Sequence, residues 1–394
     1  MTVRKITENI YAVGVVDWNV RAFHGHTYVT DRGSTYNAYL IVDDKITLID
    51  TVYGPFSKEL LANIKEVIDP AKIDYIVANH VETDHSGALP EVLKASPKAK
   101  VYGTAKCKEG LEKYYQIPLN FQVVKTGDKL PLGKRTLSFI EAPMIHWPDS
   151  MFTYSIEDQI LFPNDAFGQH YATNKTFTDE VDECSLWEEA SKYYANILWP
   201  LGMMIEKKIN EVKQMNIPIK VIAPSHGLIW RKEPMKIVEA YLRWAQNTTK
   251  KKVIVFYETM WRSTEKMALK ILEGITSQGV EARLYDVTQV DRTTLIDDLL
   301  EAKGFVVGSS THDNEMLPSI AGFLYFLKGL KPKNRIAAAF GSYGWGGGAV
   351  KNIEDELKSA GVELAVPSLQ FKFTPTPEEL KQCFELGKAF ALKV

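Results

Sequence analysis

The stretch HVETDHSG, residues 80 to 87, places four potential metal ligands within six positions, directly after the apolar run YIVAN. Such a run is typical of a buried strand. Carboxylates and imidazoles this close together are costly to hold without a cation, because like charges repel and burial removes their hydration. The fold must therefore bring these side chains together at the end of the strand. We expect a metal to be held there by His80, Glu82, Asp84 and His85.

Three later residues extend this cluster. His146 in HWPDS, Asp165 in NDAFGQH and His226 in PSHG each follow a strand-like run. A single histidine after a strand is more often a structural residue, but sites of α/β proteins collect at strand ends. The chain has eight histidines, and four of them fall in this set. The sequence therefore predicts one metal constellation of seven residues.

The C-terminal part alternates regularly between apolar runs and amphipathic stretches. Five strand candidates, VIVFY, EARLYDV, GFVVGSS, RIAAAFG and LAVPSLQ, are separated by helical candidates. This alternation predicts a doubly wound parallel sheet of the flavodoxin-like type.

Polar and glycine-rich loops follow three of these strands. A helix N-terminus binds phosphate, and glycines let the backbone approach a flat ring. Taken alone, each loop is weak, because a Ser/Thr-rich helix start is more often a plain N-cap and GWGGG can be a turn. The first loop is not GxGxxG, which favours a mononucleotide over a dinucleotide. The predicted binding residues are Thr259, Met260, Trp261, Arg262, Ser263 and Thr264, then Ser310, Thr311, His312, Asp313 and Asn314, and finally Ser342, Tyr343, Gly344, Trp345, Gly346 and Gly347.

A chain of 394 residues is too long for one typical core, so we expect two domains. The polar stretch QNTTKKK, residues 246–252, reads as the linker. The predicted domains are 1–248, an α+β arrangement of sheets covered by helices, and 249–394, the doubly wound sheet.

Composition excludes several classes of protein. The net charge of −2 argues against a nucleic-acid partner, and the absence of long apolar runs and of a signal peptide predicts no membrane partner and a cytoplasmic location. Cys107, Cys184 and Cys383 form no Cys-x-x-Cys pair, which argues against a disulfide framework, a zinc ribbon or an iron–sulfur cluster.

The metal motif resembles that of the metallo-β-lactamase fold, whose usual form is His-x-His-x-Asp-His. Here Glu82 stands at the second histidine. Zinc hydrolase sites favour imidazole and thiolate, whereas the added carboxylate is a harder, anionic ligand. This departure favours a redox pair of irons over a pair of zinc ions.

The chain as a whole resembles the flavodiiron proteins, or A-type flavoproteins, through STYNAYLIVDDK, HVETDHSGALP, HWPDSMFTY, NDAFGQH, KYYANI, PSHG, MWRSTEKMA and FGSYGWGGG in that order. The resemblance implies a metallo-β-lactamase-like αββα domain followed by a flavodoxin-like domain that binds FMN. One iron would be held by His80, Glu82 and His146, the other by Asp84, His85 and His226, with Asp165 between them. It also points to His24 and Tyr194 near the irons, although KYYANI reads equally well as a packed helix.

The resemblance further implies that FMN passes electrons to the two irons, which reduce O2 to water and/or NO to N2O. No rubredoxin-like cysteine segment is present, so we expect a separate donor, a rubredoxin-like protein or a reduced deazaflavin or nicotinamide system. A head-to-tail homodimer, or a dimer of dimers, is expected. Asp313 and Glu315 depart from the family's middle loop and are expected to alter the flavin potential rather than FMN binding.

Two other functions remain open at the level of sequence. The first is a zinc hydrolase with an accessory flavodoxin-like domain, against which Glu82 and the three loops argue. The second is an electron carrier or redox sensor with a structural diiron site, against which the complete ligand set argues.

Overall fold

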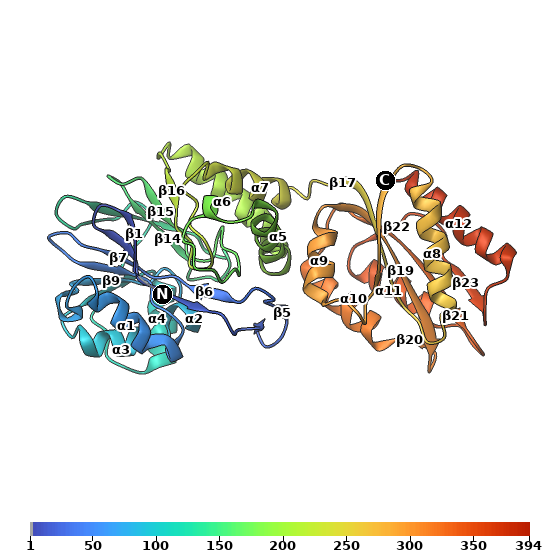
Figure 1. Ribbon diagram of the computed structural model, residues 1–394, viewed down its shortest axis with the longest axis horizontal. Coiled ribbons are helices and arrows are strands. Elements are labelled where there is room, and N and C mark those ends of the chain that lie inside the picture. The colour runs from blue at the N-terminus through green and yellow to red at the C-terminus, as the bar shows by residue number, and fades with distance from the viewer. Residues whose placement is uncertain (1–2) are drawn as a thin grey trace. The chain divides into compact units, whose positions relative to one another are not determined.

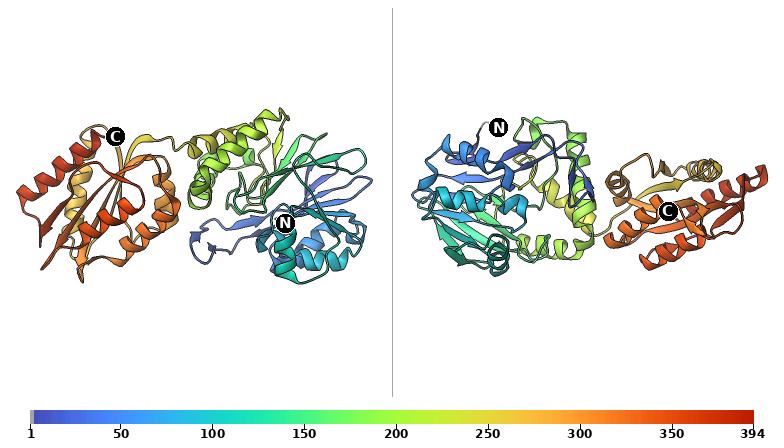
Figure 2. Two further views of the ribbon diagram at one scale, coloured as in Figure 1. Left: turned by 180° about the vertical axis from the view of Figure 1, so that it is seen from behind. Right: turned by 90° about the horizontal axis from the view of Figure 1, so that it is seen from below.

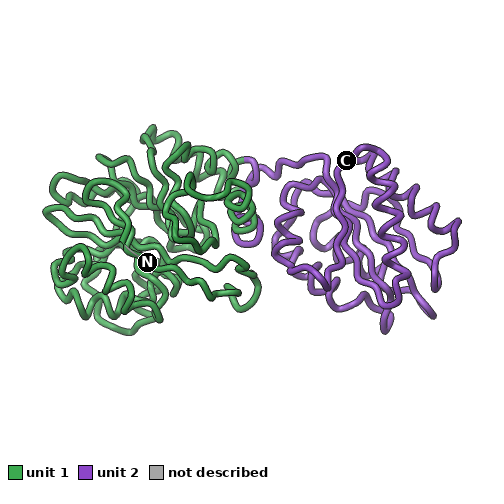
Figure 3. Tube along the Cα trace, in the orientation of Figure 1, with its two compact units in different colours: residues 1–193, 203–242 green, residues 194–202, 243–394 purple. Residues whose placement is uncertain are grey.

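The structure is a computed structural model that describes residues 3–394 and divides into two compact units (Figure 3). The first unit comprises residues up to 193 and 203–242, and the second comprises 194–202 and 243–394. The short segment 194–202 thus belongs to the second unit, although the residues on either side of it belong to the first. None of the helices within residues 3–394 is long and apolar enough to cross a membrane.

Two β-sheets form the centre of the first unit (Figure 1). Tyr39 contacts Phe162 across them with ring centroids 5.1 Å apart, within a mainly apolar core between the sheets. The first sheet has the order β1 (Arg4–Thr7), β2 (Ile10–Ala12), β7 (Tyr39–Ile41), β8 (Thr47–Ile49), β9 (Tyr75–Val77), β10 (Lys100–Gly103) and β11 (Phe121–Val123); the second has β12 (Lys129–Pro131), β13 (Thr136–Glu141), β14 (Met151–Ser155), β15 (Ile160–Phe162) and β16 (Val221–Ile222).

Helices cover the outer face of each sheet, which gives the αββα order (Figures 1 and 2). Alternate residues of the first sheet, such as Leu40 and Ile76, point away from the partner sheet into a second core under three helices, α1 (Ser57–Lys65), α3 (Leu89–Ala95) and α4 (Ala105–Tyr115). The second sheet is covered by α6 (Gly202–Gln214) and α7 (Met235–Ala245), and Ile209 and Val238 face its residues Phe152 and Leu161. Helix α5 (Glu183–Tyr193) precedes them and continues into the π-helix Tyr194–Leu198.

The run STYNAYLIV has a strand-like pattern throughout but forms two strands. Strand β6 (Ser34–Tyr36) pairs with β3 (Val15–Asp17) in a small ribbon, whereas β7 joins the first sheet. Asn37 separates them, and its side chain donates to the carbonyls of Pro224 and Gly227 at 2.8 and 2.9 Å. A second ribbon pairs β4 (Ala22–Phe23) with β5 (Tyr28–Val29).

The second unit contains the predicted parallel sheet. The order β18 (Glu281–Asp286), β17 (Lys250–Glu258), β19 (Ala302–His312), β21 (Ile336–Tyr343), β22 (Glu363–Leu364) is that of a flavodoxin-like sheet. LAVPSLQ was expected as one strand but splits into β22 and β23 (Leu369–Lys372), because Pro367 has no N–H for the ladder. One face is covered by α8 (Ser263–Thr276) and α12 (Pro377–Ala391), and the other by α9 (Arg292–Leu300), α10 (Pro318–Leu330) and α11 (Ala349–Ser359) (Figure 1).

Candidate metal centre

All seven predicted ligands lie at one end of the sandwich, where strands stop. His80 follows β9, His146 lies between β13 and β14, and Asp165 follows β15. Glu82 immediately precedes the one-turn helix α2 (Thr83–Ser86), which carries the next two ligands, and His226 follows β16. Strands from both sheets thus bring together residues that are far apart in the sequence.

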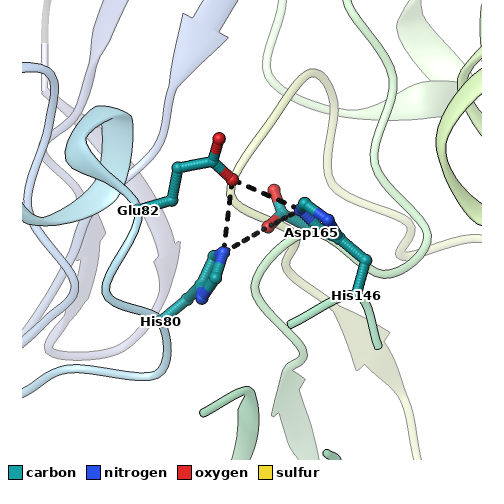
Figure 4. Close-up of side chains that lie close together, drawn as sticks. All are labelled: His80, Glu82, His146 and Asp165. Atoms are coloured by element: carbon teal, nitrogen blue, oxygen red, sulfur yellow. Dashed lines mark hydrogen bonds and ion pairs between the residues drawn. The ribbon is translucent and has the colours of Figure 1, made fainter. Parts of the chain in front are cut away.

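Four side chains enclose a first position (Figure 4). Oε2 of Glu82 lies 3.3 Å from Nε2 of His80 and 3.4 Å from Nε2 of His146. Oδ2 of Asp165 lies 3.7 and 3.3 Å from the same two nitrogens. Donor atoms that hold one cation at about 2.1 Å in a tetrahedron lie about 3.4 Å apart. These spacings therefore fit a single metal ion.

A second position lies on the other side of Asp165. Oδ1 of Asp165 lies 3.0 Å from Nε2 of His85 and 3.4 Å from Nε2 of His226. The carboxylate of Asp84 completes the group, with oxygens 3.4 and 3.1 Å from those nitrogens. Asp165 therefore turns one oxygen to each position, as a bridging carboxylate does.

The loop that carries His226 is held in place by residues of the strand-like run STYNAYLIV. The Thr35 carbonyl accepts a 2.6 Å hydrogen bond from Nδ1 of His226, and the Thr35 hydroxyl accepts one from Gly227 N–H. The Tyr39 hydroxyl donates to the Pro224 carbonyl. The only indication in the sequence that this run contacts the His226 loop is the polar Asn37 within it.

Of the two residues expected near the irons, one lies there. Nε2 of His24 is 3.4 Å from Oε1 of Glu82. The ring of Tyr194 packs 5.1 Å from that of Trp244. The neighbouring Tyr193 donates from its hydroxyl to Oδ1 of Asp165 at 3.1 Å. Consecutive helical residues point about 100° apart, so only one tyrosine of this pair can face the metal centre.

Polar atoms in the cluster are buried without hydrogen bonds. Within the described chain, Oδ1 of Asp84, Oδ2 of Asp165 and Nε2 of His85 make none. Buried polar atoms are normally satisfied, so unsatisfied atoms that face each of the two positions fit a cation bound at each. The residues present therefore suit two metal ions.

Protons take the place of the cations when no metal is bound. Burial alone would lower the pKa of His80 and of His146, but hydrogen bonds to carboxylates outweigh burial and raise each pKa to about 10. Burial would also lower the pKa of His85, but the negative charges of Asp165 and Asp84 outweigh it and raise that pKa to about 9. Burial alone would raise the pKa of Glu82 and of Asp165, yet the histidines hold both well below the usual range.

We expect the stability of the metal-free protein to fall as pH rises from about 7 to about 9.5. The three raised pKa values mean that protons stabilise the folded state fully below about pH 6.5, and this stabilisation is lost through pH 9 to 10. Each group contributes about 1.4 kcal/mol per pH unit in that window. Denaturant unfolding of chelated and metal-loaded protein at several pH values measures this. Parallel pH profiles for the two forms would contradict the expectation.

A second site is formed by the three loops of the other unit. Helix α8 begins at Ser263, and Arg262 before it has φ of 65° and makes no side-chain cap. The first N–H groups of α8 are therefore open to an anion. The Thr259 hydroxyl oxygen is buried and has no hydrogen-bond partner among residues 3–394. An unpaired hydroxyl beside a free helix start fits a phosphate.

Hydroxyl groups join the three loops to one another. The Thr264 hydroxyl lies 3.0 Å from that of Ser310 and 2.9 Å from that of Ser342. The Thr311 hydroxyl accepts from the N–H of Gly348 at 3.4 Å, before α11. The predicted loop residues thus share one edge of the sheet: those of 259–264 and 342–347 lie at strand ends, and those of 310–314 continue β19 into a hairpin with β20 (Glu315–Met316).

The outer rim of this site is aromatic and exposed. Trp261 and Trp345 are 87% and 96% exposed, which is unusual for tryptophan. Asp313 and Asn314 form the hairpin turn with φ of 51° and 61°. Gly344 and Gly346 leave room beside Trp345 for a flat ring, whereas Gly347 packs against the side chain of Gln370.

Comparisons with known proteins agree with both units. Residues 35–227 match the family described as ODP family beta lactamase, and residues 255–387 match flavodoxin. A nitric oxide reductase of Moorella thermoacetica is 51% identical over 99% of this chain and 98% of its own. The solved rubredoxin oxygen:oxidoreductase of Desulfovibrio gigas superimposes with a TM-score of 0.97 at 37% identity, over 100% and 98% of the two chains.

The solved flavodiiron protein of Giardia intestinalis superimposes with a TM-score of 0.96 at 36% identity, over 100% of this chain and 97% of that one. The relatives therefore share both units, in the same order and over nearly their full lengths. Together with the paired metal positions and the three-loop site, this similarity shows that the chain belongs to the flavodiiron protein family.

Proposed function

We propose that the protein is an oxidoreductase that reduces NO to N2O and/or O2 to water at a non-heme diiron site, with electrons delivered through FMN. The observation that carries the proposal is the pair of metal positions that share Asp165 within a chain that also contains a flavodoxin unit. Each position has two histidines and one carboxylate of its own, a ligand set typical of non-heme iron. The names of the relatives, a nitric oxide reductase and an oxygen oxidoreductase, support both substrates.

The chain's residues have distinct roles in this proposal. His80, Glu82 and His146 hold one iron, Asp84, His85 and His226 hold the other, and the loops at 259–264, 310–314 and 342–347 hold FMN. When bound, the two irons and the flavin supply the electrons, four for O2 and two for a pair of NO molecules. The chain itself keeps the histidines in place and provides access for the gas.

A surface hollow of about 580 Å³ reaches the metal centre. Three aromatic side chains and two predicted metal ligands line it: Phe23, Tyr36, Tyr53, Glu82 and Asp84. Small neutral gases need no charged partner to enter such a hollow. His24 also lines it, beside Glu82, and is placed to hand a proton from solvent to the site as oxygen atoms become water.

A zinc hydrolase is the weaker alternative. The Glu82 oxygen lies within 3.4 Å of both histidine nitrogens of the first position and so acts there as an anionic ligand. The usual metallo-β-lactamase motif has a neutral imidazole at this position instead. A hydrolase would also have no use for the open helix start and buried hydroxyl of the second unit.

We further propose a cytoplasmic head-to-tail homodimer, or a dimer of dimers, that receives electrons from a separate rubredoxin-like or deazaflavin donor. The relative named rubredoxin oxygen:oxidoreductase supports the donor class. Two tryptophans as exposed as Trp261 and Trp345 favour a surface that a second copy covers. A monomer by light scattering that keeps full activity on dilution would contradict the dimer.

The decisive experiment is elemental analysis of protein from anaerobic, iron-sufficient growth, followed by gas consumption with photoreduced deazaflavin as donor. We expect about two irons and one FMN per chain, and consumption of NO or O2. Zinc in place of iron, with no gas consumed and an ester or lactam hydrolysed, would establish the hydrolase instead. If the protein holds two irons but consumes neither gas, an electron carrier or redox sensor is the function that remains.

Trp345→Ala is expected to weaken FMN binding about 3- to 10-fold, because an aromatic contact contributes about 0.5–1.5 kcal/mol. The metal content should not change. Flavin fluorescence measures the affinity, and Trp18→Ala, which removes an exposed tryptophan of the first unit, is the control. Equal effects of the two substitutions would show that Trp345 makes no contact with the flavin.

A further inference from the structure

The two metal positions have ligands of the same types. Each has two imidazoles, one carboxylate of its own and one oxygen of Asp165. If the ligands alone decided affinity, the two positions would bind metal about equally. A built-in difference must then come from the groups that contact the ligands, among them those behind the histidines, on the ring nitrogen that faces away from the metal.

Those groups differ sharply. Nδ1 of His80 lies 3.0 Å from Oδ2 of Asp149, an anionic partner. Nδ1 of His226 donates to the neutral carbonyl of Thr35. Nδ1 of His85 is buried and has no partner in the described part of the chain. Of these three histidines, only His80 has a carboxylate at hydrogen-bond distance from Nδ1; the buried Asp50 acts on His85 through its charge alone.

Asp149 is fixed in place by the surrounding fold. Its side chain is 4% exposed, and Oδ2 also accepts from the N–H of Val81 at 2.7 Å. Its own carbonyl accepts from the Thr104 hydroxyl at 2.9 Å. Thr104 is the N-cap of α4 and accepts in turn from the N–H of Cys107. The carboxylate is thus held by the loop after β9, and the backbone of Asp149 by the start of α4.

A carboxylate on Nδ1 has two physical effects on a metal-bound histidine. It accepts a hydrogen bond from Nδ1–H, which keeps the proton on Nδ1 and leaves the Nε2 lone pair free to point at the metal. Its charge also makes the imidazole a stronger donor. A neutral carbonyl, such as that behind His226, has the first effect but much less of the second.

We propose that Asp149 is a positioning residue that makes the position of His80, Glu82 and His146 the tighter of the two metal sites and the first to fill. The inference uses the proposed function only in requiring that two metals bind. It does not depend on which gas is reduced or on turnover.

The test is a titration of chelated, FMN-containing full-length protein with Co²⁺, followed by absorbance and calorimetry. The wild type is expected to bind two equivalents in unequal steps. Asp149→Asn keeps the side-chain shape and an oxygen that can accept from His80 and Val81, but removes the charge. It should weaken the tighter step about 10- to 100-fold and leave the weaker step unchanged.

Two further variants complete the design. Asp158→Asn is the matched control, because that carboxylate pairs with Arg135 at 2.9 Å and contacts no ligand histidine. His226→Ala removes the second position, and in this background Asp149→Asn should weaken the one step that remains. Asp149→Ala removes both the charge and the acceptor, and is expected to weaken that step further.

The outcomes separate this inference from the metal centre itself. If Asp149→Asn binds Co²⁺ like the wild type, or weakens both steps equally, the role of Asp149 is overturned while the metal centre stands. If the wild type binds no Co²⁺ and no Fe²⁺, the metal centre is overturned as well. Selective loss of the tighter step, with Asp158→Asn unaffected, supports the inference.

Discussion

Asp165→Ala will remove both metals and reduce gas consumption below about 1% of the wild type, while FMN stays bound. The carboxylate is the only group that serves both positions among the described residues, with Oδ1 facing His85 and His226 and Oδ2 facing His80 and His146. Without it each position loses an anionic ligand, and the Tyr193 and Ser225 hydroxyls lose their acceptor. Losses of this kind commonly exceed 100-fold in affinity or rate.

The measurement is iron per chain by elemental analysis together with flavin absorbance. Asp165→Asn gives a sharper second test, since an amide offers one oxygen in place of two. We expect it to keep about one metal per chain and to accept the same two hydroxyl hydrogen bonds. Asp179→Ala, which removes a surface carboxylate paired with Arg231, is the control. An Asp165→Ala protein that keeps two irons and full activity would refute the bridging role.

Thr259→Val is expected to weaken FMN about 10- to 100-fold, because a hydrogen bond to a charged group contributes about 1.5–3 kcal/mol. The Thr259 hydroxyl is buried without a partner beside the open start of α8, where a phosphate would lie. Valine has nearly the same shape, so the loop should keep its structure. The protein without flavin should be at least as stable as the wild type, since an unsatisfied hydroxyl is removed.

Riboflavin separates the phosphate from the ring in this experiment, because it lacks the phosphate. Thr259→Val should bind riboflavin like the wild type while it loses affinity for FMN. Thr276→Val, at the far end of α8, is the matched control. If FMN and riboflavin weaken equally, the Thr259 hydroxyl does not serve the phosphate and the loop has been disturbed.

The parts predicted best from sequence were those set by local patterns. His80, Glu82, Asp84 and His85 stand within six positions, so no long-range information was needed to place them together. The alternation of apolar and amphipathic runs likewise sufficed for the parallel sheet of the second unit. Strand ends on one sheet edge then implied that the three loops meet, as the Thr264 hydroxyl bonds show.

The parts that were missed depend on contacts between distant residues. STYNAYLIV has a strand pattern throughout, and only the bonds of Asn37 to the loop of His226 divide it. The choice between Tyr193 and Tyr194 depends on helix rotation, which local sequence leaves open. Asp149 lies within the quoted HWPDS stretch, but its role becomes visible only from the position of the His80 ring, which contacts its carboxylate.

The ligands of the two positions also enter the chain at different times during synthesis. The first position needs nothing beyond Asp165, and its backing carboxylate, Asp149, is already present by then. The second position waits for His226 and for strand β16, the edge strand of its sheet. Because the N-terminal part of a chain leaves the ribosome first, every ligand of the first position is available before the last histidine of the second. The order in which the ligands appear during synthesis is thus the same as the order of affinity proposed for the two positions.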